Sequence, residues 1–475
     1  MADAVGSKTH SSLVTIFAIW NTMLGTSMLT MPWAVAQAGI GASIICFVIV
    51  GALCLYTTYR VVDSPRFLQE APVNPDTMPS YRRLVDPAKR LMEPARKNED
   101  IEFVDVCAKL LGPIGRWVAV IFSAVALLGT TIVFWELMSK FLHNLGLFVY
   151  DVASGHHTLL KISNPLECHG NSAPSNITDD YETEPDFRKN TWIFGVLDNR
   201  FTWPCVLSLV VFPLVSIRDA GFTQKFTALG TLSAIYLLGF VTYHATEWGV
   251  NIEFSNSTSV HYDAPFKTTF VSLTGVLCMS FFVQNCILTL LKLQNNPAKN
   301  TRDLCIAFGL VAATYLLIGI PFYLTFPLKK GCISANFVGN FAANDNLATV
   351  TRAFLLLQYL SLFPLIASIL RDLVLKTVCK SPDSDYLRNC LFNSALIGVC
   401  IFITIFVPQI GIILRYCGAM TGMAYVFALP SIVYMVGSRK HGKLGIFGGI
   451  FHSVLVVLGV INMLAQFLES YFLEQ

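Results

Sequence analysis

The stretch WNTMLGTSMLTMPWA, residues 20–34, lies within an apolar segment that is long enough to cross a bilayer. It nevertheless places Gly25, Thr26 and Ser27 side by side near the middle of that segment. In hydrocarbon, an irregular backbone is tolerated only where it is buried in protein or lines a cavity. The stretch therefore predicts a membrane helix that is broken at mid-depth to form a site. The alternative is that these small residues only allow close helix packing.

The composition is that of a protein with several membrane spans. The chain has 475 residues, of which 54% are hydrophobic and 13% are charged, whereas soluble domains contain about 25% charged residues. The net charge of +3 comes without a basic tract, so no nucleic acid partner is expected. No nucleophile–base pair, metal-ligand set or phosphate loop stands out, which argues against an enzyme and against an organic cofactor. The first apolar run is too long for a cleavable signal peptide.

Hydropathy predicts an all-α integral membrane protein with eleven spans. Each span is close to the roughly 20 residues that a bilayer requires. The expected spans are 13–38, 41–63, 113–150, 201–218, 225–246, 270–293, 302–326, 348–376, 387–409, 411–437 and 445–472.

Charged residues alternate between the loops and predict the orientation. Lys and Arg concentrate in the long loop 65–100 and in the SRKHGK stretch at 438–443, which should be cytosolic together with residues 1–12. The loops at 151–200 and 247–269 lack that basic character and should face the lumen or the outside. With eleven spans, the end of the 438–475 segment is then lumenal.

Two kinds of residue support this topology. The glycosylation sequons at Asn176 and Asn256 both fall in predicted lumenal loops, although so short a motif can also be unused. Cys168 and Cys332 also lie in lumenal loops, a compartment that permits disulfides. We expect these two cysteines to pair, and two free lumenal thiols are the alternative.

A second interruption lies five spans after the first. The stretch LTGVLCMSFFVQNC, residues 273–286, contains Gly275, Ser280, Gln284 and Asn285. Paired interruptions at corresponding positions of two repeats mark the binding site of many secondary transporters. The pattern predicts inverted repeats at 13–246 and 270–437 plus one added span. No convincing residue identity links the two halves.

Two further spans carry polar residues that need an explanation. Ser361 precedes Pro364, and proline frees a backbone carbonyl, so an oxygen-rich pocket suited to Na⁺ is one interpretation. The other is that Ser361 bonds back to its own helix. Glu136 is an intramembrane carboxylate and hence a functional candidate. Lys140 follows one turn later and could pair with it, which would make the pair structural.

Four stretches resemble the amino acid/auxin permease family, and within it the sodium-coupled neutral amino acid transporters, closest to their lysosomal, arginine-sensing branch. The resemblance covers nearly all of the membrane region from about Leu13 onward. The stretches are IWNTMLGTSMLTMPWAVAQAG at 19–39, LTGVLCMSFFVQNCILTLLK at 273–292, RDLCIA at 302–307 and GIILRYCGAMTGMAYVFALPSIVY at 411–434.

The resemblance implies the bacterial leucine-transporter type of fold, with helices 1 and 6 broken, lumenal glycans and a disulfide that matches Cys168 to Cys332. It also implies two groups of site residues. The Na⁺ group is Asn21, Thr26 and Ser361. The substrate group is Thr22, Met23, Gly25, Thr26, Ser27, Cys278, Ser280 and Phe281, to which Glu136 is added as a candidate for a cationic side chain or proton coupling.

The expected function is secondary active transport of a cationic or neutral amino acid across the lysosomal or late endosomal membrane, with Na⁺ as the coupling ion. An amino acid sensor with little flux, signalling to cytosolic growth-control machinery, is the alternative, and the plasma membrane is the alternative location. Three features depart from the family pattern. Only residues 1–12 precede the first span, Glu136 stands where an apolar residue is expected, and the 65–100 loop is long. The sequence does not name the amino acid or decide between Na⁺ and H⁺.

Overall fold

The computed structural model describes residues 11–68, 102–153, 166, 168, 201–216, 220–292, 294–379, 386–407 and 409–473. These residues form helices and connecting loops without a strand, so the expected all-α class is confirmed for them. The α-helices are α1 (Ser12–Leu24), α2 (Ser27–Ala38), α3 (Ile40–Asp63), α5 (Phe103–Ala153), α9 (Thr202–Ser216), α10 (Ala220–Trp248), α11 (Phe270–Ser280), α12 (Ile287–Lys292), α13 (Asn300–Thr325), α14 (Asn346–Cys379), α15 (Tyr386–Phe406), α16 (Ile410–Thr421), α17 (Leu429–Lys440) and α18 (Ile446–Leu473). Shorter helical segments are η1 (Ser64–Leu68), η3 (Pro297–Lys299), η4 (Lys330–Cys332), η5 (Phe337–Asn340) and the π-helical η6 (Gly422–Ala428) between α16 and α17.

Seven helices in the described part of the chain are long and apolar enough to cross a membrane. The number is eight when α1 and α2 count as one span, since these two helices meet at a bend of 58°. The predicted spans 13–38 and 270–293 are therefore not single helices: the first is divided into α1 and α2, and the second into α11 and α12. The predicted span 113–150 belongs to the longer helix α5, which is kinked at Gly112.

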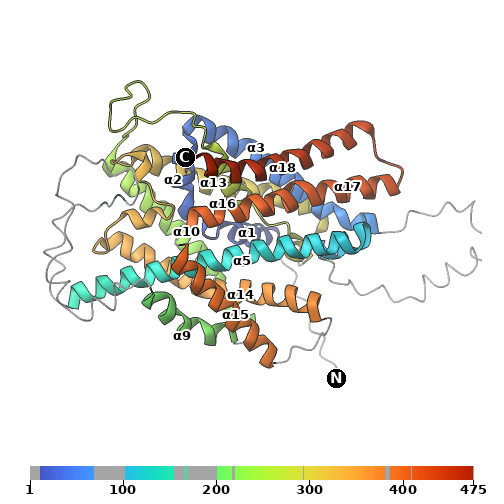
Figure 1. Ribbon diagram of the computed structural model, residues 1–475, viewed down its shortest axis with the longest axis horizontal. Coiled ribbons are helices and arrows are strands. Elements are labelled where there is room, and N and C mark those ends of the chain that lie inside the picture. The colour runs from blue at the N-terminus through green and yellow to red at the C-terminus, as the bar shows by residue number, and fades with distance from the viewer. Residues whose placement is uncertain are drawn as a thin grey trace, which may run out of the picture.

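Most helices run along the long axis of the molecule, and α5 extends along much of that length (Figure 1). In this view α3 and α18 lie toward one edge, and α9, α14 and α15 lie toward the other (Figure 1). Helix α5 packs on α14, on α16 and on α9. The short helices α1 and α2 both pack against α13, and the short helix α11 packs against α2.

Helix α1 ends at Leu24 because of the backbone at Gly25. Gly25 has φ +35° and ψ −139°, a conformation that side chains with a Cβ adopt only at a cost. The helical hydrogen-bond ladder stops there, and α2 starts at Ser27 in a new direction. The Gly-Thr-Ser interruption in the sequence is thus a true break in the helix.

The loop before α11 closes the far end of α2. The Lys267 ammonium donates a 2.6 Å hydrogen bond to the Ala36 carbonyl, and the Thr269 hydroxyl donates to the Gln37 carbonyl. The backbone N–H of Lys267 donates to Ala38 O at 3.0 Å. These donors satisfy the last carbonyls of α2, which no intrahelical N–H can reach. Helix α2 and the start of α11 are therefore joined as one unit.

A disulfide joins Cys168 to Cys332, with their Cα atoms 4.8 Å apart. Cys332 lies in loop residues 326–345, and Tyr323 near the preceding end of α13 donates a hydrogen bond to Asp263 in loop residues 249–269, so both loops lie at this end of the molecule. We call this end the disulfide side. Asn256 lies on it and is exposed. The other expected glycosylation site, Asn176, lies outside the described residues, as do Met1–His10 and nearly all of the 65–100 loop.

Removing the disulfide should destabilise the protein. The bridge connects positions 164 residues apart, and loss of a native disulfide typically lowers the free energy of unfolding by about 2–5 kcal/mol. Cys332→Ser should therefore lower the melting temperature of the purified protein clearly. Cys205→Ser, which changes an exposed free thiol, is the matched control and should leave the melting temperature unchanged. Equal melting temperatures for both variants would contradict a stabilising bridge.

Candidate substrate site

The break between α1 and α2 brings several polar groups into the interior. Thr26 and Ser27 are buried, and Gly25 between them and α1 is half-buried. Met23 is buried as well, but Thr22 is exposed and its hydroxyl donates to Ala18 O of its own helix at 2.7 Å. The substrate-site prediction for Thr22 therefore concerns a side chain that points away from the break in this conformation.

The second break lies beside the first. Helix α11 ends at Ser280, and α12 begins at Ile287. Cys278, Ser280 and Phe281 are all buried, and the Ser280 hydroxyl donates to Val276 O at 2.7 Å. The Phe281 ring stacks on Phe308 with centroids 5.8 Å apart. The three predicted side-chain pocket residues thus surround the end of α11.

Tyr315 of α13 ties the two breaks together. Its hydroxyl lies 2.6 Å from Met23 O at the end of α1 and 3.1 Å from Ser280 O at the end of α11. Leu24 O lies 3.5 Å from the same hydroxyl. Tyr315 is fully buried. The hydroxyl has one hydrogen, which the Met23 and Ser280 carbonyls share, with the shorter contact to Met23 O. The tyrosine thus supplies a donor at a buried point where both helices end.

A further hydrogen bond holds α1 on α13. The Trp20 indole donates a 3.1 Å hydrogen bond to the hydroxyl of Thr314, the residue just before Tyr315. The end of α1 is thus held by two adjacent residues of α13. Thr26 and Ser27 at the first break and Ser280 and Gln284 at the second are buried, whereas Gly25 and Asn285 are half-buried.

Two of the predicted Na⁺ ligands, Asn21 on α1 and Ser361 on α14, lie on helices that both pack against α10. Asn21 on α1 packs so closely on α10 that a Cβ atom at Gly230 would lie 2.4 Å from its Oδ1. Helix α10 also packs along α14, which carries Ser361. The Ser361 hydroxyl donates to Gln358 O of its own helix at 2.6 Å, as in the structural alternative. The buried side-chain oxygen of Gln358 has no hydrogen-bond partner among the described residues.

This donor set fits a hard cation in its chemistry. Carboxamide, hydroxyl and carbonyl oxygens are available from Asn21, Ser361 and Gln358, and hard cations prefer oxygen ligands. A hydroxyl that donates to a carbonyl keeps its lone pairs free to bind a cation. Sodium binding therefore stays a prediction that the observed residues can accommodate.

Glu136 is fully buried in the middle of α5 and pairs within its own helix. Its Oε1 lies 2.8 Å from Lys140 Nζ. Its Oε2 has no partner among the described residues. The preceding residues face α14: Phe134 stacks on Tyr359, with ring centroids 4.9 Å apart, and Trp135 contacts Phe363. This part of α5 therefore lies along the stretch of α14 that carries Ser361.

Comparison with known proteins identifies the family. The chain matches the family described as transmembrane amino acid transporter protein over residues 8–165 and 175–472. The chain belongs to this family. The resemblance inferred from the sequence is thereby confirmed, and a non-enzymatic transporter class is shown.

Several relatives match nearly the whole chain. The sodium-coupled neutral amino acid transporter 9 homolog of Caenorhabditis elegans is 37% identical over 477 residues, which cover 97% of this chain and 74% of the relative. The neutral amino acid transporter 9 of Danio rerio is 36% identical over 475 residues, which cover 96% of this chain and 81% of the relative. The corresponding protein of Rattus norvegicus is 36% identical, with 97% of this chain and 80% of the relative covered.

A solved structure shows the same fold. The crystal structure of MhsT in complex with L-phenylalanine superposes with a TM-score of 0.54, covering 97% of this chain and 99% of that chain. Sequence identity is 11%, so the likeness concerns the fold alone. MhsT has the leucine-transporter type of fold, which agrees with the expectation for this transporter family.

Sequence reasoning found both breaks in this transporter but missed the residue that joins them. Tyr315 lies in an apolar helix and is 292 residues from Met23 in the chain. A tyrosine in a membrane helix is a weak signal by itself, because it can also face the bilayer interface. Its neighbour Thr314 gives no further indication.

Removing the Tyr315 hydroxyl should weaken both breaks. Tyr315→Phe removes the one hydroxyl hydrogen that the Met23 and Ser280 carbonyls share, and an unsatisfied buried polar group costs about 1–3 kcal/mol. We expect a lower melting temperature and an amino acid uptake reduced on the order of tenfold or more. Tyr243→Phe, at a half-exposed ring of α10, is the control. Unchanged uptake and stability in Tyr315→Phe would show that the hydroxyl does not hold the breaks.

Proposed function

We propose that this chain is a secondary transporter that carries an amino acid across the lysosomal or late endosomal membrane by alternating access, with Na⁺ as coupling ion. The family supports amino acid transport. The observation that carries the proposal is the pair of helix breaks held at one point by Tyr315. Such breaks supply free backbone donors and acceptors at the depth where transporters bind their substrates.

The first break suits the common part of every amino acid. The N-terminus of α2 at Ser27 presents backbone N–H groups and the positive end of a helix dipole, which favour a carboxylate. The C-terminus of α1 at Leu24 presents carbonyls, which favour an ammonium group. Gly25 between them has no side chain to obstruct the ligand. Backbone recognition at this point would accept many amino acids.

The second break and Glu136 would then select the side chain. Cys278, Ser280 and Phe281 offer a small polar and aromatic wall. Glu136 offers a buried carboxylate oxygen that Lys140 does not occupy. A cationic substrate side chain could form an ion pair with this oxygen, whereas a neutral side chain could not. This assignment makes the cationic or neutral preference depend on one residue.

Sodium would bind beside the substrate and couple its movement to a gradient. Asn21, Thr26 and Ser361 are the residues proposed to hold it, and Gln358 adds a buried oxygen. A bound cation supplies positive charge near the substrate carboxylate. Asn21 and Thr26 flank the first break, so the ion would stabilise the same broken segment that binds the substrate.

The full architecture is proposed to contain eleven spans, with inverted repeats at 13–246 and 270–437. The broken helices α1/α2 and α11/α12 would open the two repeats, which is the arrangement of inverted-repeat transporters. The MhsT-like fold supports this arrangement. The organellar location is proposed from the resemblance of the sequence to the lysosomal branch, and the exposed Asn256 would carry a lumenal glycan.

Uptake into proteoliposomes tests the transport function. Arginine, leucine, glutamine, glutamate and cystine are offered with and without Na⁺ at two pH values. We expect saturable, Na⁺-dependent uptake, its loss in Thr26→Trp because the indole fills the break, and a Na⁺ requirement raised about tenfold in Ser361→Ala. Thr242→Ala, at an exposed hydroxyl bonded within α10, is the control. Thermal stabilisation by an amino acid without any flux would replace the transporter proposal by the sensor alternative.

The role of Glu136 is tested by its isosteric amide. Glu136→Gln removes the charge but keeps the shape, so arginine uptake should fall about 10- to 100-fold while leucine uptake persists. Glu247→Gln, at an exposed carboxylate of α10, is the control. An equal fall for arginine and leucine together with a lower melting temperature would assign Glu136 to a structural pair with Lys140.

A further inference from the structure

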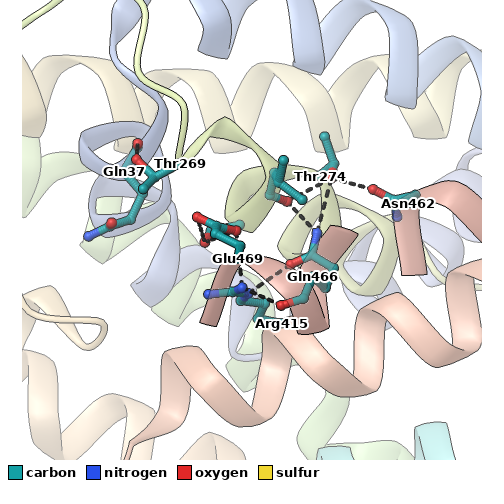
Figure 2. Close-up of polar contacts among 9 residues, drawn as sticks. Gln37, Thr269, Thr274, Arg415, Asn462, Gln466 and Glu469 are labelled. Atoms are coloured by element: carbon teal, nitrogen blue, oxygen red, sulfur yellow. Dashed lines mark hydrogen bonds and ion pairs between the residues drawn. The ribbon is translucent and has the colours of Figure 1, made fainter. Parts of the chain in front are cut away.

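A polar cluster on the disulfide side connects the helices α11, α16 and α18. Arg415 of α16, Gln466 and Glu469 of α18, and Ser272 and Thr274 of α11 form it (Figure 2). Gln466 is fully buried, and the side chains of Arg415 and Glu469 are 9% and 11% exposed. None of these residues belongs to the substrate or sodium site described above.

Arg415 is held entirely by α18 in this cluster. Its Nε donates to Gln466 Oε1 at 2.8 Å, its guanidinium also reaches the Gln466 carbonyl, and its Nη2 lies 3.0 Å from Glu469 Oε2. The neighbouring ring of Tyr416 stacks on Phe467, with centroids 4.9 Å apart. Helices α16 and α18 are thus joined by charged and aromatic contacts.

The same α18 residues hold α11. The Gln466 amide donates to Val271 O and, at 3.2 Å, to the Thr274 hydroxyl. The Ser272 hydroxyl lies 3.2 Å from Glu469 Oε1, and the Thr274 hydroxyl lies 2.6 Å from Asn462 Oδ1. Gln466 therefore uses its oxygen for α16 and its nitrogen for α11, which makes it the joint between the two helices.

Helices α11 and α16 contact each other directly through glycine residues. A Cβ atom at Gly418 of α16 would lie 2.1 Å from the Gly275 carbonyl of α11, so the two backbones touch. A Cβ at Gly422 would lie 2.8 Å from that of Cys278. Small residues let membrane helices approach closely and associate through van der Waals contact. The polar bonds to α18 add a directional connection between α11 and α16, and each of these bonds can be removed by a single substitution.

Helix α11 is also connected to α2. The Thr269 hydroxyl donates to Gln37 O at the end of α2 (Figure 2). The hydrogen bond from Lys267 Nζ to Ala36 O fastens the same end to the segment that leads into α11. Holding α11 therefore holds α2. Together α2 and α11 cover the two breaks on the disulfide side.

We propose that Arg415, Gln466 and Glu469 form a latch that keeps α11 and α2 closed over the amino acid site, so that α18 controls access from the disulfide side. The proposal rests on the alternating-access function proposed above. Opening on this side would separate α11 from α16 at the glycine contact and break the bonds from Gln466 and Glu469. The alternative is that the cluster only anchors α18 to the rest of the protein.

Native cysteines on either side of the second break allow a direct test. Cys278 of α11 is buried on the disulfide side of the break, and Cys286 lies on its opposite side. A hydrophilic maleimide is applied to the protein in nanodiscs, and labelling at each cysteine is read by mass spectrometry. We expect Glu469→Gln and Gln466→Leu to speed labelling of Cys278 on the order of tenfold, with Cys286 unchanged.

The matched control loosens the other end of α18. Tyr56→Phe removes the 3.0 Å contact between the Tyr56 hydroxyl and His452 Nε2 near the opposite end of this helix. This variant should leave Cys278 labelling at the wild-type rate. Equal acceleration at Cys278 and Cys286, or acceleration in Tyr56→Phe as well, would show general loosening and overturn the latch. Unchanged Cys278 labelling in both latch variants would overturn it too.

A locked variant provides a second arm. Thr274→Cys with Asn462→Cys places two thiols where the side chains now touch. Oxidation to a disulfide should stop amino acid uptake, and reduction should restore it. Uptake that persists in the fully cross-linked protein would overturn the latch. If the wild-type protein has no flux, the transport proposal fails, and the cysteine-labelling rates still decide whether the cluster gates access.

Discussion

The structure depends on one constraint of the bilayer: every backbone N–H and C=O that lies at membrane depth needs a partner inside the protein. Two helices of this chain break that rule locally, at Gly25 and after Ser280, and both breaks are buried. Tyr315 repairs the damage by placing one hydroxyl within reach of carbonyls from both helix ends. The two breaks therefore form a single site, and α13 is its support.

The breaks also divide the protein mechanically. Beyond them, on the disulfide side, α2 and α11 are short helices that end near loops, and polar bonds fasten them to each other and then to α18 and α16. A chain of hydrogen bonds can be exchanged for water when the side opens, at little net change in free energy. The proposed latch depends on this exchange, because its polar bonds to α18 supplement the close glycine contact between α11 and α16.

Two ion pairs among the described residues, Glu136–Lys140 and Arg415–Glu469, differ in which helices they connect. Glu136 and Lys140 lie one turn apart on the same helix, so their pair connects no elements and leaves one carboxylate oxygen for another partner. Arg415 and Glu469 lie on different helices, and their hydrogen bonds are completed by Gln466 and Ser272. A buried charge with spare capacity is suited to a ligand. A buried charge whose hydrogen bonds are completed is suited to holding helices in register.

Local chemistry accounts for the features of this protein that could be predicted from its sequence. Apolar length predicted an all-α membrane protein, and Gly25-Thr26-Ser27 predicted a break, because glycine and hydroxyl residues weaken a helix, although close helix packing was the alternative. The groups that meet across the chain were settled by the tertiary structure alone: Tyr315 with Met23, 292 residues away, and Arg415 with Gln466, 51 residues away. Such contacts depend on the rotation and depth of packed helices, which hydropathy does not encode. In the sequence, a single tyrosine or arginine of an apolar helix carries no mark of the helix that it will face.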